Sequence, residues 1–544
     1  MNQSPQKTSP KKPSRWHVTL QAWLLYIAAV FVGSIATTIP LAVWVGPILI
    51  LLFLDQMPRL IGFVLFMLFA ISVFVISQKG VIPVPDTEFY FMAVIIGLLG
   101  YFTYWLQVAS KDRLPRFLVP LVLPCASVAL EYGASAGAFG SWGATGYSQA
   151  GNLTLMQLAS ITGVSGITFF MCWTTSTVWW LVSSVKLSDK KIPAEAITYF
   201  VFAIAIIAFG QYRIAIGKAL LSQPADGRQV ACVIAPKGTY TPEIVFRWLD
   251  AARSEQSDAE SGTATSNETQ TLLDESRPVV FAELEYLLRK SVERATAGAK
   301  LIVWSEAALS TPPEFESEIL DRCSEFAKKY STNLAMTLGV LRPKTDAGKF
   351  IENKTVFINE EGGVLGEYFK TKTVPGEPSL NGDGMIPTFE TKFVGRVSPI
   401  VCFDADFPNF VSQIGQTKTE NTGPHTIVIS ANDWEECAGQ HMQMSAFRAI
   451  ENGMWVVRST SRGTSAVISP LGEVQERLSS FECAEPAMSG WISGNRLQTW
   501  YPMIGDLLAQ ASCVGFLLLI LMAIFGSKRS NHESDQPGHI ENGN

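Results

Sequence analysis

Hydrophobic residues along the chain gather into eight long runs, seven of them before residue 216 and one near the C-terminus. Each run is long enough, or nearly so, to cross about 30 Å of hydrocarbon as a helix that rises about 1.5 Å per residue. The pattern therefore predicts a membrane domain of about seven helices over 19–215 and a C-terminal membrane helix over 506–527. The runs cover residues 19–38, 40–54 (the shortest), 60–77, 89–108, 117–132, 154–182, 196–215 and 507–526.

Between residues 216 and 505, short apolar runs of strand type alternate with segments whose apolar residues recur at helical spacing. Alternation of this kind predicts a layered α/β domain outside the membrane. Residues 253–277 are rich in Ser, Thr, Glu and Asp without periodicity, so they predict a mobile surface insertion. The strand-type runs are 229–234, 301–304, 334–340 and 355–358, and the helical segments are 283–296 and 319–330.

Basic residues in the loops indicate how the chain is oriented in the membrane. If the basic tail over 1–18 is cytoplasmic, the loops on its side carry seven Lys and Arg residues, whereas the opposite loops carry only Lys79. This bias follows the positive-inside rule. It places residues 216–505 outside the cytoplasm and returns the polar tail over 528–544 to the inside. The loops on the side of the tail are 55–59, 109–116 and 183–195, and the opposite loops are 78–88 and 133–153.

Composition agrees with a membrane part and narrows the chemistry. Hydrophobic residues make up 48% of the chain and charged residues 17%, with a mean hydropathy of +0.21, which is too apolar for one ordinary soluble enzyme. The net charge of −6 argues against a nucleic-acid partner. The eight cysteines form no C-x-x-C pair, and the five histidines show no ligand spacing, so we expect no metal site.

Three stretches in the extramembrane part end in residues of complementary chemistry. Cys402 follows an apolar run of strand type, Glu306 ends a second such run, and Lys370 lies just before a Val-Pro-Gly turn. Judged alone, Cys402 fits a buried core cysteine better than a nucleophile. Together, the glutamate can act as general base on the thiol. The lysine can lower the thiol pKa and stabilise an oxyanion, and the cysteine can attack a carbonyl.

The three stretches resemble the nitrilase, or carbon–nitrogen hydrolase, superfamily with its Glu-Lys-Cys triad. The spacing Tyr-x-Lys-x-x-x-Val-Pro over 368–375 is most similar to the apolipoprotein N-acyltransferases of bacterial envelopes. The membrane part adds to this resemblance through the outer loop over 133–143, which is rich in glycine and aromatic residues, and through 157–159 and 163–166. Taken alone, that loop indicates either a re-entrant turn or a lipid-binding segment. Soluble nitrilases have no membrane spans, so the resemblance in both halves favours the acyltransferases.

The resemblance implies a four-layer α-β-β-α sandwich and assigns Glu306, Lys370 and Cys402 as the catalytic triad. Glu377 matches a further glutamate that the family needs near its active site, although the turn before it lacks one residue of the usual Val-Pro-Phe-Gly-Glu. Trp304 belongs to Trp-Ser-Glu, where the family usually has Trp-Pro-Glu.

Phe403 and Asp404 match an aromatic residue and an acid that follow the family's cysteine, although the acid is Glu in most acyltransferases. Asp404 is equally compatible with a turn or helix cap. Lys372 is interpreted as a solvated lysine, because Lys370 has the matching spacing. His441 is interpreted as a structural residue, because Glu306 already fills the role of the base. The stretches around residues 433, 448 and 458 are expected to shape the sheet and the cavity.

The resemblance implies a monomeric N-acyltransferase of the bacterial inner membrane, with its catalytic domain on the periplasmic side and no cofactor or metal. An acyl chain would pass from a membrane phospholipid, through a thioester on Cys402, to the N-terminal amine of a diacylglyceryl-cysteine lipoprotein. A membrane-tethered nitrilase-like amidase is the alternative, supported by Asp404 and the shortened turn. A transporter or scaffold is disfavoured because the spans hold few ionisable residues, with Glu131 the chief exception.

The loop charges make the orientation testable with reporter fusions. A reporter fused after Arg228 should be active only outside the cytoplasm, and one fused after Lys528 only inside, because an odd number of spans separates residue 228 from the N-terminal tail. Alkaline phosphatase and green fluorescent protein activities measure the two locations. A cytoplasmic signal at residue 228 would overturn the span count.

Overall fold

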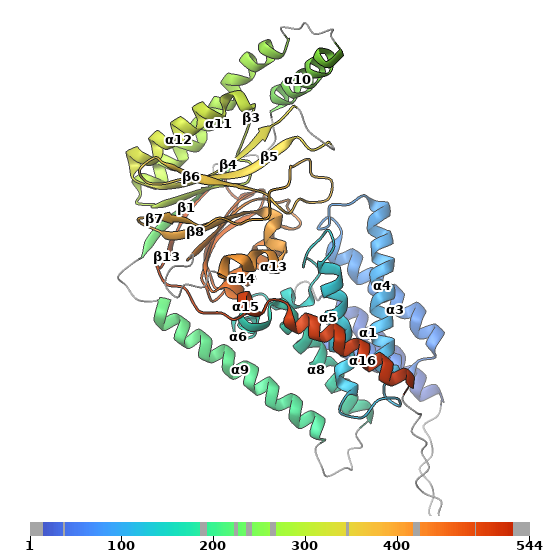
Figure 1. Cartoon of the computed structure of the whole chain (residues 1–544). Coiled ribbons are helices and arrows are strands. Elements are labelled where there is room, and N and C mark those ends of the chain that lie inside the picture. The colour runs from blue at the N-terminus through green and yellow to red at the C-terminus, as the bar shows by residue number, and fades with distance from the viewer. Residues whose placement is uncertain are drawn as a thin grey trace, which may run out of the picture.

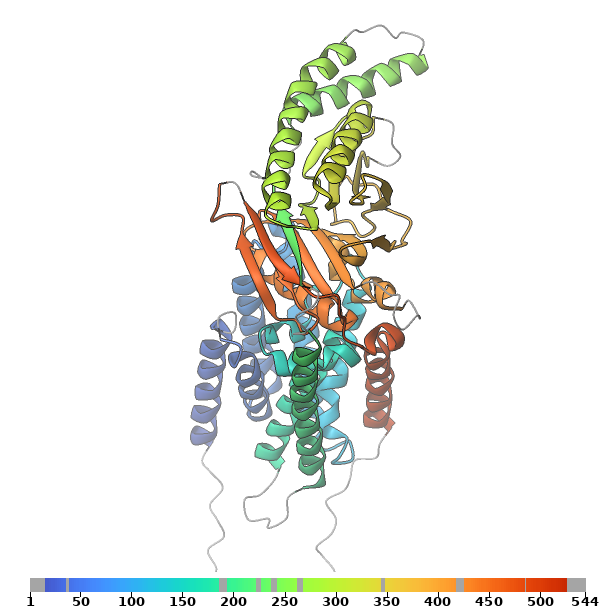
Figure 2. The same cartoon turned by 90° about the vertical axis from the view of Figure 1, so that its left-hand side faces the viewer.

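The computed structural model describes residues 15–35, 39–184, 193–221, 227–235, 242–261, 268–343, 348–416, 425–484 and 486–525 of the chain. Apolar helices form a polytopic membrane domain, and in Figure 2 most of them stand side by side beneath the sheets. Among the described residues, four helices are long and apolar enough to cross a membrane, and a bent pair would make a fifth. The apolar helices of this domain, shorter ones included, are α1 (Arg15–Ser34), α2 (Ala42–Gln56), α3 (Arg59–Gln78), α4 (Asp86–Ala109), α5 (Val122–Ser135), α8 (Val164–Ser184), α9 (Ala194–Leu221) and α16 (Leu507–Phe525).

The apolar run over 154–182 is not one straight span, so that expectation is wrong. A short helical segment over Leu153–Thr162 meets α8 at an angle of 119°, and Gly163 lies at the bend. Gly163 has φ +63°, which glycine adopts without steric cost, and a Cβ there would come within 2.5 Å of the Tyr501 ring. The hydrophobic pattern does not reveal the bend, because the segments before and after Gly163 are both apolar.

The extramembrane domain contains two β-sheets, one with the order β13-β1-β2-β4-β5-β6 and β3 beside β4, the other with the order β12-β11-β10-β9-β8-β7. The central strands of both sheets run parallel. Parallel strands are buried on both faces, which explains their nearly continuous apolar sequences. The strands are β1 (Arg228–Val233), β2 (Leu301–Trp304), β3 (Leu309–Thr311), β4 (Asn333–Leu341), β5 (Ile351–Ile358), β6 (Val364–Phe369), β7 (Phe389–Thr391), β8 (Gly395–Val401), β9 (Thr426–Asn432), β10 (Trp455–Ser461), β11 (Thr464–Ile468), β12 (Val474–Ser479) and β13 (Ala487–Ile492).

The two sheets pack face to face through side chains such as Val230 and Val303 on one side and Val428 and Val457 on the other. Helices α11 (Glu268–Thr296) and α12 (Glu316–Tyr330) cover the outer face of the first sheet, and α14 (Ala438–Asn452) covers that of the second (Figure 1). The expected α-β-β-α sandwich is therefore confirmed.

The expectation of an aperiodic insertion over 253–277 is wrong for the described residues. They belong to α10 (Glu243–Ser261) and α11, which pack against each other at the end of the domain farthest from the membrane helices (Figure 1). Leu272 and Ser276 are buried, in register with Val280 further along α11. One buried side chain per turn, with a serine among them, leaves too few hydrophobic positions for the sequence to be recognised as a periodic helix.

The limits expected for the extramembrane domain, before residue 216 and at residue 506, stay predictions. The first strand, β1, and the last strand, β13, both lie inside them. The N-terminal tail up to residue 14 and the whole C-terminal tail lie outside the described residues. The second sheet stands on the membrane domain through α14. Side chains of that sheet and of α14 share one apolar core with membrane-domain residues such as Met156, Val164 and Ile167.

The loop over 139–145 joins the two domains and makes Gly140 a sensitive position. Gly140 has φ +55°, and a Cβ there would lie 2.5 Å from the carbonyl oxygen of Asp406. We expect Gly140→Ala to lower the stability of the protein by about 1–3 kcal/mol, because alanine is strained in this conformation and the loop must move. Thermal unfolding in detergent measures the effect. Gly143→Ala is the matched control, since no atom lies within 4 Å of its Cβ position. Equal melting temperatures for the two variants would contradict the prediction.

Candidate active site

Cys402 lies at a sharp turn where β8 ends and a short 3-10 helix, η5 (Cys402–Asp406), begins. Its φ of +47° is in the left-handed region, which is unusual for a residue with a side chain. Of the four described non-glycine residues with positive φ, Cys402 and Ala307 both line one cavity. Ala307 directly follows Glu306. Strained backbone therefore occurs at one predicted catalytic residue, Cys402, and next to another, Glu306.

Lys370 follows β6 and is 2% exposed. Its ammonium donates hydrogen bonds to Glu306 Oε1 at 2.8 Å and to both carboxylate oxygens of Glu377, at 2.9 and 2.7 Å. Glu306 follows β2 and also accepts a hydrogen bond from Asn353 Nδ2 at 2.7 Å. The lysine is thus held between two carboxylates that come from separate parts of the chain.

These charges decide the protonation of the site. Burial lowers the pKa of Lys370, but Glu306 and Glu377 outweigh burial and hold the pKa well above its ordinary value. For Glu377 the directions are opposite. Burial raises the pKa of its carboxyl, but Lys370 lowers it by more, so the net shift is downward. The ammonium is therefore charged at neutral pH, and two carboxylates offset its charge.

Lys370 does lower the pKa of the Cys402 thiol, as expected, but other effects outweigh it. Burial, followed by the Glu306 carboxylate, raises that pKa well above 9, so the net shift is upward. The thiol is therefore neutral at rest. A nucleophilic attack by Cys402 requires that its proton be removed during the attack, which is the work of a nearby base.

A cavity of about 290 Å³ brings Glu306, Lys370, Glu377 and Cys402 together. Such a volume holds a small acyl or amide group with its immediate neighbours. Of the rest of its lining, only Asn432 and Trp434 belong to a stretch that was expected to shape the cavity. The rest of the lining comprises Ala307, Ser310, Gly339, Ile351, Asn353, Val374, Ser379, Asn432 and Trp434.

Asp404 ties the cysteine turn to the segment that carries the lysine. Its carboxylate accepts hydrogen bonds from Val401 N–H (2.9 Å), from Thr371 and Lys372 N–H (3.2 and 2.7 Å) and from Tyr368 Oη (2.7 Å). Burial raises the pKa of this carboxyl to about 6, although the bonds oppose the shift. Asp404 does close the first turn of η5, as the cap interpretation expected, and it also connects two segments.

Trp304 and Phe403, the other two predicted residues, are buried but do not line the cavity. Trp304 packs under the helices of the first sheet, where its Nε1 donates to Ser291 Oγ at 3.0 Å. Phe403 packs against Phe407 beside Trp142 of the membrane domain. Their supporting roles stay predictions. Lys372, which was expected to be solvated, lies over the rings of Phe407 and Phe410 at 5.0 and 5.5 Å.

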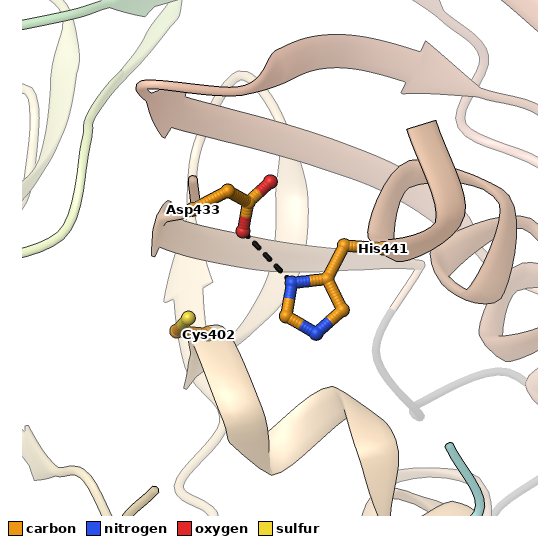
Figure 3. A group of neighbouring side chains, drawn as sticks. All are labelled: Cys402, Asp433 and His441. Carbon is orange, nitrogen blue, oxygen red and sulfur yellow. Dashed lines mark hydrogen bonds and ion pairs between the residues drawn. The ribbon is translucent and has the colours of Figure 1, made fainter. Parts of the chain in front are cut away.

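Sequence reasoning missed Asn353 and the surroundings of His441. Asn353 is a buried polar residue on the inner strand β5, and a polar residue inside a strand was the available signal. His441, Asp433 and Cys402 come together from three separate elements, with their ligand-type atoms all within 4.8 Å of one another (Figure 3). Distances between elements of this kind are invisible in a sequence.

The donor set around His441 does not suit a metal ion. Nδ1 of His441 lies 2.8 Å from Asp433 Oδ1, and Nε2 lies 3.0 Å from Asp406 Oδ2. Arg458 Nη2 donates to both oxygens of Asp433 at 2.8 Å. A metal would need a free nitrogen lone pair and a free carboxylate oxygen, whereas here both are engaged by other side chains.

Comparisons with known proteins match both halves of the chain. A family model described as carbon-nitrogen hydrolase matches residues 268–484, and one described as apolipoprotein N-acyltransferase N-terminal domain matches residues 24–177. Two solved structures are also similar. An amidase from Nesterenkonia sp. is 15% identical, with 54% of this chain and 99% of that one covered and a TM-score of 0.33. A member of branch 10 of the nitrilase superfamily from Saccharomyces cerevisiae is 18% identical, with 54% and 95% covered and a TM-score of 0.34.

Three curated proteins, all named apolipoprotein N-acyltransferase, are similar to the chain. The protein from Geobacter metallireducens is 23% identical over 436 residues, which is 75% of each chain, and that from Bradyrhizobium diazoefficiens is 25% identical over 70% of this chain and 68% of its own. The protein from Rickettsia prowazekii is 29% identical, over 33% of this chain and 39% of its own. With one family model matching the membrane domain and the other the α-β-β-α sandwich, the chain belongs to the apolipoprotein N-acyltransferase family, the membrane-bound branch of the carbon–nitrogen hydrolases.

Proposed function

We propose that this protein transfers a fatty acyl chain from a membrane phospholipid, through a thioester on Cys402, to the N-terminal amine of a diacylglyceryl-cysteine lipoprotein. The observation that carries the proposal is the meeting of Glu306, Lys370 and Cys402 in one cavity of a domain that stands on membrane helices. The names of the relatives support an acyl transfer to lipoproteins. The loop charges support a catalytic domain on the outer side of the inner membrane.

In the first half-reaction, Glu306 accepts the proton of Cys402 as the sulfur attacks the ester carbonyl of the phospholipid. The resulting oxyanion is stabilised by the ammonium of Lys370 and the backbone N–H of Phe403. When the carbon–oxygen bond breaks, the proton on Glu306 passes to the departing lysophospholipid oxygen. The acyl group remains on Cys402 as a thioester, and both carboxylates return to their starting charge.

In the second half-reaction, the amine of the acceptor attacks the thioester carbonyl and loses a proton to Glu306. The carbon–sulfur bond breaks, and the proton returns to the sulfur of Cys402 as the amide forms. Glu377 serves throughout as the permanent partner of Lys370. Because Glu377 keeps a negative charge beside the lysine while Glu306 is protonated, the ammonium is never left buried without a partner.

Cavities at the junction of the two domains support delivery of lipid substrates from the bilayer. A cavity of about 410 Å³ is lined by Phe407 and Asn409 of the catalytic domain together with Tyr132 and Val164 of the membrane domain. A second cavity of about 360 Å³ lies among membrane helices, and Glu131 lines both. Substrates that are anchored in lipid would approach the catalytic domain from this side.

The neighbouring lysines offer a matched test of the catalytic assignment. Lys370→Met should cut acyl transfer about 10³-fold or more, because it removes the charge that stabilises the oxyanion and leaves two carboxylates unpaired. Lys372→Met should cost little, since Lys372 does not line the cavity with Cys402; it lies over two aromatic rings at the edge of the junction cavity. Transfer to a fluorescent lipopeptide measures both rates. An inactive Lys372→Met beside an active Lys370→Met would show that the two roles are exchanged.

A trapped intermediate separates the acyltransferase from the amidase. With labelled phospholipid alone, one acyl group should remain on Cys402, because the buried thioester waits for an amine. Neutral hydroxylamine should release it, and Cys402→Ala should lack it. Intact-protein mass spectrometry detects the adduct.

The acceptor completes this test. A diacylated lipopeptide with a free N-terminal amine should discharge the thioester into an amide, whereas its N-acetylated form has no nucleophile and should not. Steady release of fatty acid or ammonia, at equal rates with either lipopeptide and with no trapped adduct, would leave nitrilase-type hydrolysis instead.

A further inference from the structure

A second group of buried charges lies directly behind the cysteine turn and is not used in the mechanism above. It consists of His441, Asp406, Asp433 and Arg458, all at most 3% exposed. Each comes from a different place: Asp406 ends η5, Asp433 follows β9, His441 lies on α14, and Arg458 on β10. Four buried charges cost folding free energy unless they are paired, so their arrangement needs a reason.

The contacts of His441 are those of an imidazolium, with a proton on each ring nitrogen. Each nitrogen faces a carboxylate oxygen within 3.0 Å, and a neutral ring would bring a nitrogen lone pair against one of these oxygens. Two carboxylates, one imidazolium and one guanidinium then balance in charge. In agreement, burial lowers the pKa of His441, but Asp406 and Asp433 outweigh burial and hold it well above 6.5.

The two carboxylates that His441 joins belong to two different segments that each contribute lining residues to the active cavity. Asp406 closes the turn that begins at Cys402. Asp433 lies between Asn432, whose carbonyl oxygen is 3.9 Å from the cysteine sulfur, and Trp434, which lines the cavity. By holding both, His441 sets the distance between the nucleophile and the wall that faces it.

The same histidine is in contact with the membrane domain. The ring of Trp142, from the loop over 139–145, lies edge-on to His441 at 4.5 Å and stacks parallel to Trp434 at 6.0 Å. Ser141 of this loop donates two hydrogen bonds, from its N–H and from Oγ, to the carbonyl oxygen of Asp406, both at 2.8 Å. The loop therefore touches both groups that the histidine holds.

We propose that His441 is a positioning residue for the acyl transfer: it fixes the Cys402 turn, the Trp434 wall and the membrane-domain loop over 139–145 relative to one another. His441 does not act as a base on the reacting atoms, because each of its ring nitrogens is hydrogen-bonded to a carboxylate. This proposal rests on the proposed function only where acyl-transfer activity is measured. A second measurement, the reactivity of the Cys402 thiol, needs no lipid.

The test uses the full-length protein in detergent or nanodiscs and the variant His441→Gln, with His425→Gln as the matched control. His425 lies at the other end of β9, outside the cavity and outside this charge group. Gln carries both of its N–H donors on one nitrogen, with an acceptor oxygen beside it. It therefore cannot donate to carboxylates that lie at the two different ring nitrogens of His441, and one of the two links must break. We expect the acylation rate of Cys402 at saturating phospholipid to fall at least about tenfold, with the half-saturating concentration changed less than about threefold. The control should match the wild type.

Alkylation by iodoacetamide, followed at peptide level, supplies the measurement without lipid. In His441→Gln, Cys402 should react several-fold faster than in the wild type, because its turn is released from the wall. Cys232 and Cys323, which are wholly buried in the first sheet and beneath its helices, should stay protected and so report that the domain is folded. Reaction of all three cysteines would indicate unfolding.

Asp406→Asn carries the test if His441→Gln does not fold, because it keeps the shape of the side chain and removes only its charge. It should reproduce both effects more weakly, and the double variant should be no worse than His441→Gln alone, since one bond is broken in each. Folded variants with wild-type acylation and wild-type Cys402 reactivity, or fully additive effects, would overturn the proposal. If the wild type forms no acyl adduct but the reactivity pattern holds, the proposed function fails and the positioning role stands.

Discussion

The burial of one ammonium group governs the architecture of the active site. Lys370 is almost completely removed from water, and a charged amine in such a place is tolerated only with opposite charges in contact. Glu306 and Glu377 provide them, one from the end of β2 and one from the loop beyond the lysine. This pairing sets the end of β6 against the end of β2. The thiol itself stays protonated because burial and the Glu306 carboxylate raise its pKa by more than the lysine lowers it.

A second constraint is the shared core between the catalytic and membrane domains. Helix α14 packs under the second sheet on one side and against membrane-domain residues on the other. The buried ion pair between Arg448 and Glu451 lies on this helix, and Arg448 also donates to Tyr147 of the membrane domain. Tight packing of this kind makes the junction stiff, so the cavity that holds Cys402 keeps a defined position relative to the membrane domain. The proposed transfer between two lipid-anchored substrates would depend on that position.

The errors of the sequence analysis share one cause. The bend at Gly163 and the helices over 243–261 and 268–296 depend on what lies beside them, namely Tyr501 in the first case and the neighbouring helix in the second. The sequence also did not show that the lysine's effect on the thiol pKa is outweighed, because burial and the nearness of the Glu306 carboxylate depend on the spatial surroundings. The interpretation of His441 as structural missed that it lies between two carboxylates and beside the cysteine turn.

The sequence by itself determined the hydrophobic runs that become membrane helices, the strand ends that carry Glu306 and Cys402, and the family to which these motifs belong. These features are local, because period, length and turn residues are read within a few positions of the chain. Only the tertiary structure decided which charges meet. Asn353 reaches Glu306, Asp404 reaches the segment after Lys370, and Asp406 and Asp433 meet at His441 from elements far apart in the chain. Electrostatic and hydrogen-bond energies depend on distances in space, and the packing of two sheets on a membrane domain sets those distances.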